Sequence, residues 1–175
     1  MATALMLVDI QQGMFALPSP PYRGEEVVER VAALLGRARA EGIRVVHIQH
    51  DGGPGHVLAK GSSGWPHHPR VAPRPGEIVI EKRHSSAFHG TDLHRQLGQA
   101  GIDRLVVTGM QTEMCVDSAC RGAAALDYRV VLVTDGHTTF DTPAIAADLI
   151  IAHHNRLLGR GFVELAEARQ VRFQE

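Results

Sequence analysis

Cysteine is scarce and neither sign of charge dominates, and these two features exclude several classes of protein. The 175 residues contain two cysteines, too few for a disulfide-rich secreted scaffold. Eighteen Lys and Arg against nineteen Asp and Glu leave a formal net charge of −1, without the excess of positive charge typical of proteins that bind nucleic acid or anionic membranes. No hydrophobic run approaches the ~20 residues that span a bilayer. We therefore expect no nucleic-acid partner and no membrane association.

The amino terminus also lacks the features of a secretion signal. No cationic segment precedes the first hydrophobic run, and Asp9 lies within that run. Cys115 and Cys120 are five positions apart, which on one helix means a rise of ~7.5 Å, too far for a disulfide. We expect a reduced, cytoplasmic protein. A composition of 44% hydrophobic and 21% charged residues predicts a single compact domain over residues 1–175.

Strand-like hydrophobic runs alternate with helix-like segments along the chain. The first run, Ala4 to Val8, is continuously hydrophobic, as is typical of a strand buried on both faces. Further strands are expected over 43–48, 78–80, 104–108, 129–134 and 162–165. Helices are expected over 25–41, 92–100, 112–126 and 143–158. This alternation predicts a three-layer α/β/α fold with a six-stranded, mostly parallel sheet.

One long segment interrupts this alternation. Eleven of the 25 residues from Gly52 to Gly76 are Gly or Pro, so neither a helix nor a strand is expected there. Loops of this length are usually either functional or disordered. The position directly after the second strand favours a wall over the active site, and a mobile surface loop is the alternative.

Three reactive side chains fall where strands of the predicted sheet end. Asp9 ends the first strand, Lys82 follows the third by two residues, and Cys115 lies in the first turn of the helix after the fourth. Ligands of open parallel sheets bind beyond the carboxyl ends of the strands. We therefore expect a carboxylate, an ammonium and a thiol to share one site.

This combination of groups suits nucleophilic catalysis. We expect Lys82 and the helix N-terminus to lower the pKa of the Cys115 thiol. Asp9 would accept the thiol proton and later return it to the leaving group. Backbone N–H groups at the start of the helix would hold the oxyanion, and attack on a carbonyl would produce a thioester.

Each of these residues also has an ordinary structural interpretation. A cysteine in a helix is often a small buried hydrophobic residue, an aspartate after a strand often belongs to a turn, and Lys82 could be a solvated charge. We adopt the structural interpretation for Cys120, because five residues turn it ~140° away from Cys115. The eleven histidines include no His-Glu-x-x-His pair, so we expect no metal and no cofactor.

Residues 7–11, 81–88 and 107–116 resemble the signatures of the isochorismatase-like cysteine hydrolases, a superfamily that includes nicotinamidases and N-carbamoylsarcosine amidohydrolases. The resemblance extends from about residue 5 to residue 165. It implies a sheet of strand order 3-2-1-4-5-6 and a catalytic triad of Asp9, Lys82 and Cys115. It further implies a cis peptide between Met110 and Gln111, and an oxyanion hole formed by the backbone N–H groups of Gln111 and Cys115. Members commonly self-associate, so we expect a homo-oligomer.

The resemblance has one departure that bears on the substrate. Nicotinamidases hold a metal with an Asp-x-His after the second strand, where this chain has Gln49-His50-Asp51. We therefore expect no metal and a substrate other than nicotinamide. The presence of Cys115 favours hydrolysis of a C–N bond, with isochorismatase-type cleavage of a vinyl ether as the alternative. A non-enzymatic ligand-binding module has little support, since both Gly-x-Gly-x-x-Gly and the P-loop pattern are absent.

Three aromatic residues are candidates for the substrate pocket. Phe15 follows Asp9 in the chain, Trp65 lies in the Gly/Pro-rich loop, and Phe88 follows Lys82. Flat apolar walls around a few polar groups would suit a small planar amide. Ordinary hydrophobic packing is the alternative for each of them.

Overall fold

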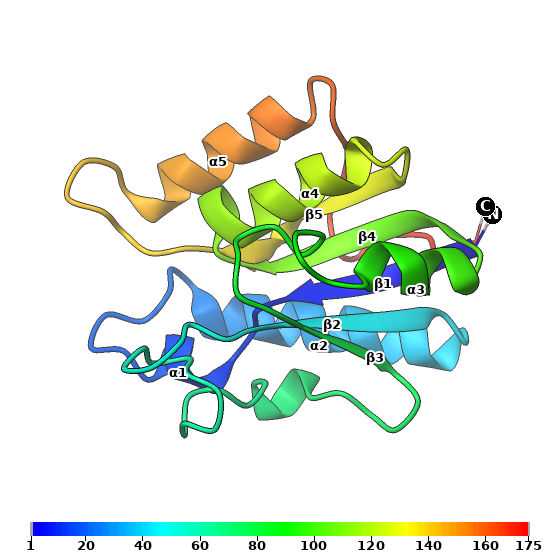
Figure 1. Cartoon of the computed structure of the whole chain (residues 1–175). Coiled ribbons are helices and arrows are strands. Elements are labelled where there is room, and N and C mark those ends of the chain that lie inside the picture. The colour runs from blue at the N-terminus through cyan, green and yellow to red at the C-terminus, as the bar shows by residue number, and fades with distance from the viewer. Residues whose placement is uncertain (1, 175) are drawn as a thin grey trace.

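A six-stranded sheet of order β3-β2-β1-β4-β5-β6 forms the centre of the molecule (Figure 1). The computed structural model describes residues 2–174. All neighbouring strands pair in parallel. The predicted fold class and strand order are therefore confirmed. The strands are β1 (Ala2–Val8), β2 (Arg44–His50), β3 (Ile78–Lys82), β4 (Ile102–Met110), β5 (Arg129–Thr138) and β6 (Glu164–Ala166).

Helices cover both faces of this sheet, as Figure 1 shows. The long helix α2 (Gly24–Ala40) packs on one face, together with the short η1 (Pro69–Val71) and residues 168–173. The other face is covered by α3 (Leu93–Gln99), α4 (Asp117–Ala124) and α5 (Ala147–Leu158). A four-residue helix, α1 (Gln12–Phe15), follows β1.

The central strand β1 is hydrophobic throughout because both of its faces are buried. Met6 and Val8 pack into the core beneath α3 and α4, while Leu5 and Leu7 pack into the core beneath α2. Each of these four side chains is at most 2% exposed. Full burial of one such aliphatic side chain contributes roughly 1.5–3 kcal/mol.

Two predicted helices begin differently in the structure. The helix expected over 112–126 starts as a π-helical turn, η2 (Thr112–Val116), before α4. The helix expected from Pro143 begins at Ala147, whose N–H donates to Asp141 Oδ1 at 2.8 Å. An aspartate side chain that satisfies a free N–H stabilises a helix start, which places this one after the proline.

The sixth strand is also displaced from its expected position of 162–165. The N–H groups of Phe162 and Val163 both donate to the carbonyl of Leu158. These two residues thereby complete the end of α5, and the strand starts two residues later than expected, at Glu164.

The Gly/Pro-rich segment 52–76 packs against the residues that follow β1. Backbone N–H groups of Gln12 and Gly13 donate to carbonyls of the loop, and His68 N–H donates to the carbonyl of Ile10. The fully buried Gln11 side chain donates to the carbonyls of both His50 and Trp65. The segment is thus fixed next to the ends of β1 and β2, as expected of a wall at the active site.

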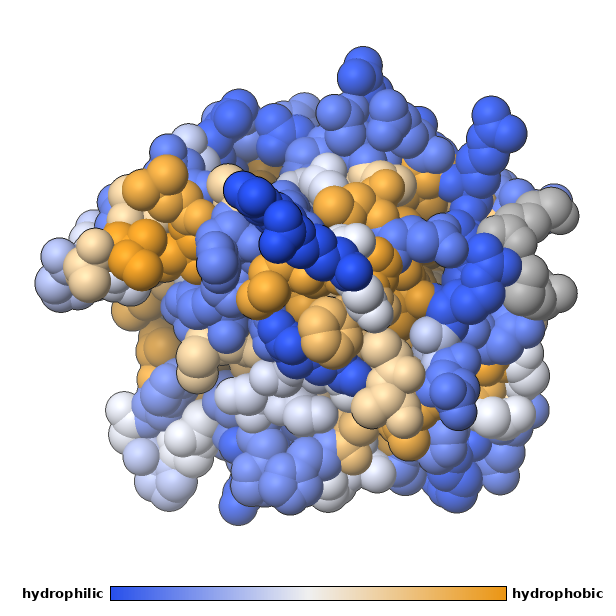
Figure 2. All heavy atoms as spheres, turned by 90° about the horizontal axis from the view of Figure 1, so that it is seen from above, coloured by the Kyte–Doolittle hydropathy of each residue, from blue (hydrophilic) through white to orange (hydrophobic). Residues whose placement is uncertain are grey.

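On the side of the molecule that carries α5, hydrophilic side chains surround hydrophobic ones, which lie across the middle of the face and at one end (Figure 2). Hydrophobic residues gather at the end where the loop between β5 and α5 lies. Ile145 in that loop and Leu149 in α5 are 50% and 61% exposed. Within residues 2–174, the helices are all too short or too polar to cross a membrane.

Gly109 allows β1 and β4 to approach closely where both strands end. It pairs with Val8 in the sheet register and has a φ of +129°, a conformation that other residues rarely adopt. A Cβ atom at this position would lie 2.1 Å from the carbonyl oxygen of Val8. Since that oxygen belongs to the backbone, it can move only if the strands separate.

We predict that Gly109→Ala lowers the free energy of unfolding by at least about 2 kcal/mol, because it combines a backbone clash with a strained φ. Urea denaturation followed by circular dichroism measures the change. Gly36→Ala is the matched control: a Cβ there meets nothing within 4 Å, so alanine should stabilise α2 by about 0.5–1 kcal/mol. Equal stability of the two variants would contradict this account of Gly109.

Candidate active site

Asp9, Lys82 and Cys115 come together at the carboxyl ends of three strands. Lys82 Nζ lies 2.7 Å from Asp9 Oδ2 and 3.2 Å from Cys115 Sγ. Asp9 and Lys82 are each only 3% exposed, whereas Cys115 is partly exposed. The predicted meeting of a carboxylate, an ammonium and a thiol is therefore present in the structure.

The Lys82 ammonium is held by neighbours on several sides. Besides its two neighbours in the triad, it donates to the backbone carbonyl of His84 at 3.0 Å. The Nδ1 atom of His50 lies 3.5 Å away. An ammonium has three protons to donate, and Asp9, Cys115 and the His84 carbonyl are the three nearest partners. The side chain is thereby fixed between the carboxylate and the sulfur.

Burial sets the protonation states of the acid and the thiol. It raises the pKa of Asp9 above its ordinary value, despite the opposing effect of the nearby Lys82. Burial, reinforced by the charge of Asp9, raises the pKa of the Cys115 thiol to about 12. The expectation that Lys82 and the helix end lower the thiol pKa is wrong: desolvation of the thiolate outweighs the attraction of the ammonium. At neutral pH the resting thiol is protonated.

The turn that carries Cys115 has an unusual backbone. The peptide bond between Met110 and Gln111 is cis. The carbonyl of Gln111 then accepts the N–H groups of Met114 and Val116, which closes the π-helical turn η2. Gln111 and Cys115, the two residues predicted to form an oxyanion hole, both line the same cavity.

A cavity of about 540 Å³ opens beside Asp9 and Cys115. The segment after β1, the loop 52–76, η2 and the residues after β5 all contribute to its wall. Its hydrophobic lining residues are Met14, Leu17, Val57, Leu58, Met110, Met114 and Phe140. Its other lining residues, apart from Asp9 and Cys115, are His50, His56, Ser85, Gln111, Glu113, Asp141 and Thr142.

None of the three aromatic residues predicted to wall the pocket is part of this lining. Phe15 packs edge-on against His68, with 4.9 Å between the ring centroids. Phe88 stacks on Tyr128 in the core beneath α3 and α4. Trp65 contributes its carbonyl to the hydrogen bonds that fix the loop. The Lys60 ammonium lies 5.4 Å from the centroid of the Trp65 ring. Packing therefore describes Phe15 and Phe88, Trp65 has Lys60 as its ring partner, and aliphatic side chains form most of the apolar wall.

Several lining residues went unnoticed in the sequence. His50 is the last residue of β2 and Phe140 follows the end of β5, so their positions at the same edge of the sheet could have indicated them. Glu113 lies only two residues before Cys115. Met14, Val57 and Leu58 come from short or irregular segments, for which no periodic pattern gives a direction.

The residues at the place of the nicotinamidase metal site have other partners. Asp51 Oδ1 accepts the N–H groups of Gly53 and Lys60, and Oδ2 accepts from Arg83. Gln49 donates to the carbonyl of Trp65. Both side chains thus have hydrogen-bond partners within the fold, and residues 2–174 hold no cluster of three or more His, Cys, Asp or Glu side chains suited to a metal ion.

Comparison with known proteins identifies the family. The model of the isochorismatase domain matches residues 3–153. The chain belongs to the isochorismatase family. A solved structure from this family, from Chromobacterium violaceum, aligns with a TM-score of 0.90 at 33% identity and covers 96% of this chain and 90% of that one.

Two relatives in the family have named activities. Streptothricin hydrolase from Streptomyces noursei is 41% identical over 141 residues, which cover 81% of this chain and 51% of that protein. The ureidoacrylate amidohydrolase RutB from Methylorubrum extorquens is 32% identical over 148 residues, covering 68% of this chain and 60% of that protein. The chain thus spans about half the length of streptothricin hydrolase.

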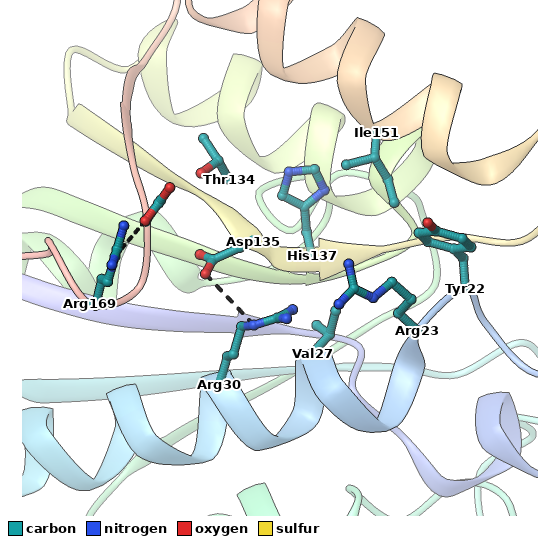
Figure 3. Close-up of a pocket in the computed structure, with 10 residues that line it drawn as sticks. Tyr22, Arg23, Val27, Arg30, Thr134, Asp135, His137, Ile151 and Arg169 are labelled. Atoms are coloured by element: carbon teal, nitrogen blue, oxygen red, sulfur yellow. Dashed lines mark hydrogen bonds and ion pairs between the residues drawn. The ribbon is translucent and has the colours of Figure 1, made fainter.

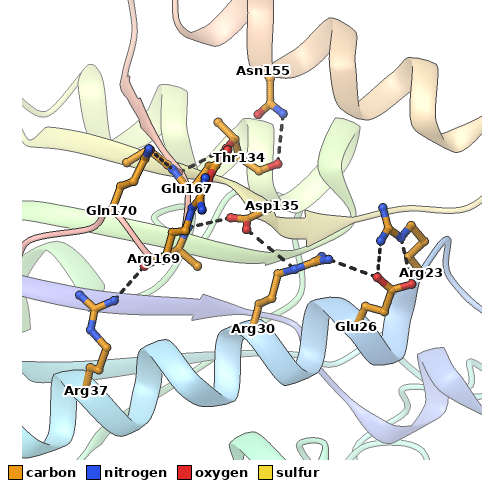
Figure 4. Close-up of polar contacts among 12 residues, drawn as sticks. Arg23, Glu26, Arg30, Arg37, Thr134, Asp135, Asn155, Glu167, Arg169 and Gln170 are labelled. Atoms are coloured by element: carbon orange, nitrogen blue, oxygen red, sulfur yellow. Dashed lines mark hydrogen bonds and ion pairs between the residues drawn. The ribbon is translucent and has the colours of Figure 1, made fainter.

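In this family member, a buried histidine forms a hydrogen bond to the turn that carries Cys115. His137 Nδ1 lies 2.8 Å from Thr112 Oγ1 in η2, and its Nε2 lies 2.9 Å from Asn155 Oδ1 in α5. Asn155 also donates to the Thr134 carbonyl (Figure 4). Since an amide oxygen only accepts, His137 Nε2 carries the proton and Nδ1 accepts from the Thr112 hydroxyl. The neutral imidazole thus links α5 to the start of η2.

A second cavity of about 420 Å³ lies on the other side of His137 (Figure 3). Three arginines line it, and each is close to a carboxylate. Arg30 lies 3.8 Å from Asp135, and Arg169 lies 2.7 Å from Glu167. Arg23 pairs with Glu26 (Figure 4). The positive charges at this cavity are therefore compensated within the chain itself.

His137 should make the stability of the protein depend on pH. Burial lowers the pKa of His137 to about 4, and the same cause lowers the pKa of His67 to about 4. In the unfolded chain both histidines have an ordinary pKa near 6.5. As the pH falls from about 6.5 toward 4, they therefore bind protons in the unfolded chain but remain neutral in the folded one. Stability is therefore fully present above about pH 6.5 and is lost progressively toward pH 4.

We predict that, between pH 7.5 and pH 5, the free energy of unfolding falls by about 2 kcal/mol less in His137→Gln than in the original chain. The quantity to measure is the pH slope from urea titrations, since the substitution also changes stability at every pH. His153→Gln, at an exposed position in α5, is the control and should keep the slope of the original chain. An unchanged slope in His137→Gln would show that this histidine is not held neutral.

Proposed function

We propose that the chain is a cysteine hydrolase that cleaves the C–N bond of a small carboxamide, or of a related small molecule, through a thioester. The observation that carries this proposal is the position of Cys115 Sγ beside a buried ammonium and a buried carboxylate at the wall of a cavity. The two catalytic partners and the nucleophile come from separate strand ends. No packing requirement explains why a buried ion pair should adjoin the one thiol that lines the cavity.

In the first half of the reaction, the thiol attacks the substrate carbonyl while Asp9 takes its proton. The raised pKa of Asp9 makes it a stronger base than an ordinary carboxylate. Lys82 stabilises the negative charge that develops on the sulfur. The backbone N–H groups of Gln111 and Cys115 are proposed to hold the tetrahedral oxyanion. The C–N bond then breaks, and Asp9 gives the proton to the departing nitrogen.

In the second half, water replaces the amine in the site. Asp9 accepts a proton from the water as its oxygen attacks the thioester carbonyl. The C–S bond breaks, and the sulfur regains a proton from Asp9. One water is consumed, and the products are a carboxylic acid and an amine or ammonia. Because the thiol rests protonated, proton transfer to Asp9 belongs to the attack step rather than preceding it.

The named relatives support amide hydrolysis. Ureidoacrylate amidohydrolase is by name an amidohydrolase, and streptothricin hydrolase is by name a hydrolase. Vinyl ether hydrolysis of the isochorismatase type is the second candidate, and the cavity argues against it. Isochorismate is a dicarboxylate, and the lining of the cavity within residues 2–174 includes no Arg or Lys to bind a carboxylate.

We predict that Cys115→Ala reduces amide hydrolysis by at least about 10³-fold, because no other group can form the thioester. A screen that measures ammonia release from small carboxamides gives the rates. Cys120→Ala is the matched control: Cys120 is fully buried in the core, so its replacement should change stability while activity stays within about twofold. Full activity in Cys115→Ala would overturn the mechanism.

The intermediate itself can be observed. Acid quenching during turnover, followed by mass spectrometry of peptides, should show the acyl group attached to Cys115. Deacylation uses Asp9 as the base, so Asp9→Asn should leave any acyl-enzyme it forms longer-lived than in the original chain. An acyl group found on another residue would contradict the thioester.

A further inference from the structure

Apart from the imidazoles of His50 and His56, the charged groups that line the active-site cavity are all acidic. They are Asp9, Glu113 and Asp141, and the described part of the lining contains neither Lys nor Arg. Lys82 adjoins the cavity, but its ammonium lies 2.7 Å from Asp9 and offsets that carboxylate. The carboxylates of Glu113 and Asp141 remain. A site with two uncompensated negative charges attracts cations and rejects anions.

Glu113 is the better placed of these two carboxylates. Its Oε1 accepts the Thr139 hydroxyl at 2.8 Å, which fixes the side chain against the residues after β5. Its Oε2 is buried and has no hydrogen-bond partner within the described residues. By contrast, Asp141 is exposed, and its Oδ1 accepts the N–H of Ala147. Only Glu113 combines a fixed orientation with an unsatisfied, poorly hydrated oxygen.

An unpaired buried carboxylate oxygen is costly for a folded chain. It persists where a ligand supplies the missing donor, and the donor that best compensates a carboxylate is a cation. Glu113 lies two residues before the nucleophile, so a group bound to it would sit close to the reacting carbonyl. The hydrophobic lining, from Met14 to Phe140, would meet the remaining carbon skeleton.

We propose that the site selects carboxamides that carry a protonated amine, with Glu113 as the residue that binds the positive charge. This inference rests on the proposed function, since it concerns the substrate of the same reaction. The two alternatives are an uncharged amide and an acidic amide, which differ from this class chiefly in charge. Substrates matched in shape can therefore test it.

The probes are three series of amides of increasing chain length. Each member of the cationic series, beginning with 3-aminopropanamide, has a neutral counterpart, beginning with butanamide, and an acidic counterpart, beginning with succinamate. Binding to Cys115→Ala is measured by calorimetry, and kcat/KM is measured with the original chain. At one or more chain lengths, the cationic amide should bind at least about tenfold more tightly than the neutral one, and its kcat/KM should be at least about tenfold higher. The acidic amide should have a lower affinity and a lower kcat/KM than either.

Glu113→Gln tests the assignment of the residue. Glutamine keeps an oxygen that can accept the Thr139 hydroxyl, so the turn should remain folded, which circular dichroism and thermal unfolding check. The preference for cationic over neutral amides, taken as the ratio of their kcat/KM values in the same variant, should fall to within about threefold. Glu167→Gln removes an exposed carboxylate paired with Arg169 outside this cavity, and it should leave the preference unchanged.

The outcomes separate this inference from the proposed function. Hydrolysis of neutral or acidic amides at least as fast as cationic ones overturns the inference and leaves the cysteine mechanism intact. Tight binding of cationic amides by Cys115→Ala, without hydrolysis of any amide by the original chain, overturns the mechanism and supports the charge selection. A cationic preference that survives in Glu113→Gln overturns the role of Glu113.

Discussion

The buried contact of the Lys82 ammonium with Asp9 is the interaction on which the rest of the site depends. Two opposite charges with almost no solvent exposure are stable only together, because removal of one leaves the other unpaired and costs roughly 3–5 kcal/mol. The pair also neutralises the charge that would otherwise repel a developing thiolate. With the ammonium 3.2 Å from the sulfur, the Asp9–Lys82 pair has no net charge and can still stabilise negative charge that develops on the sulfur.

The fold supports this contact by bringing strand ends close together. Gly109 lets β4 approach β1 at the level of Asp9. Beyond a register shift, the end of β5 places His137 against η2, and Thr139, which directly follows β5, lies against η2 as well. The turn that carries Cys115 is thereby held by hydrogen bonds with a histidine and a threonine. The first hydrogen bond joins two neutral groups, and the second joins a neutral hydroxyl to a carboxylate. Both are shielded from water, and this shielding strengthens them.

Much of this could be predicted from the sequence, since the signals are local and periodic. The continuous hydrophobic run of β1 indicated a strand buried on both faces, and the strand-end positions of Asp9, Lys82 and Cys115 indicated their proximity. The pocket wall could not be predicted, because Met14 and Val57 lie in short or irregular segments whose directions depend on tertiary contacts. The choice of Phe15, Trp65 and Phe88 failed for this reason: large aromatics also pack against cores or pair with cations, as Trp65 does with Lys60, and sequence alone does not distinguish these uses.

The thiol pKa was mispredicted for a different reason. A lysine and a helix start next to Cys115 suggest a stabilised thiolate, but burial and the nearby Asp9 carboxylate act in the opposite direction and prevail. Their balance depends on solvent exposure, which the sequence does not specify. The expected homo-oligomer and cytoplasmic location stay predictions.

The central claim is that the nucleophile rests as a neutral thiol beside an intact ion pair, and the ultraviolet absorbance of the thiolate tests it directly. The difference in absorbance between the original chain and Cys115→Ala is recorded as the pH rises from about 6 to 10. The account predicts no thiolate signal from Cys115 over this range, because its pKa is raised to about 12. A thiolate present at pH 7 would contradict it and indicate that Asp9 already holds the proton before substrate binds.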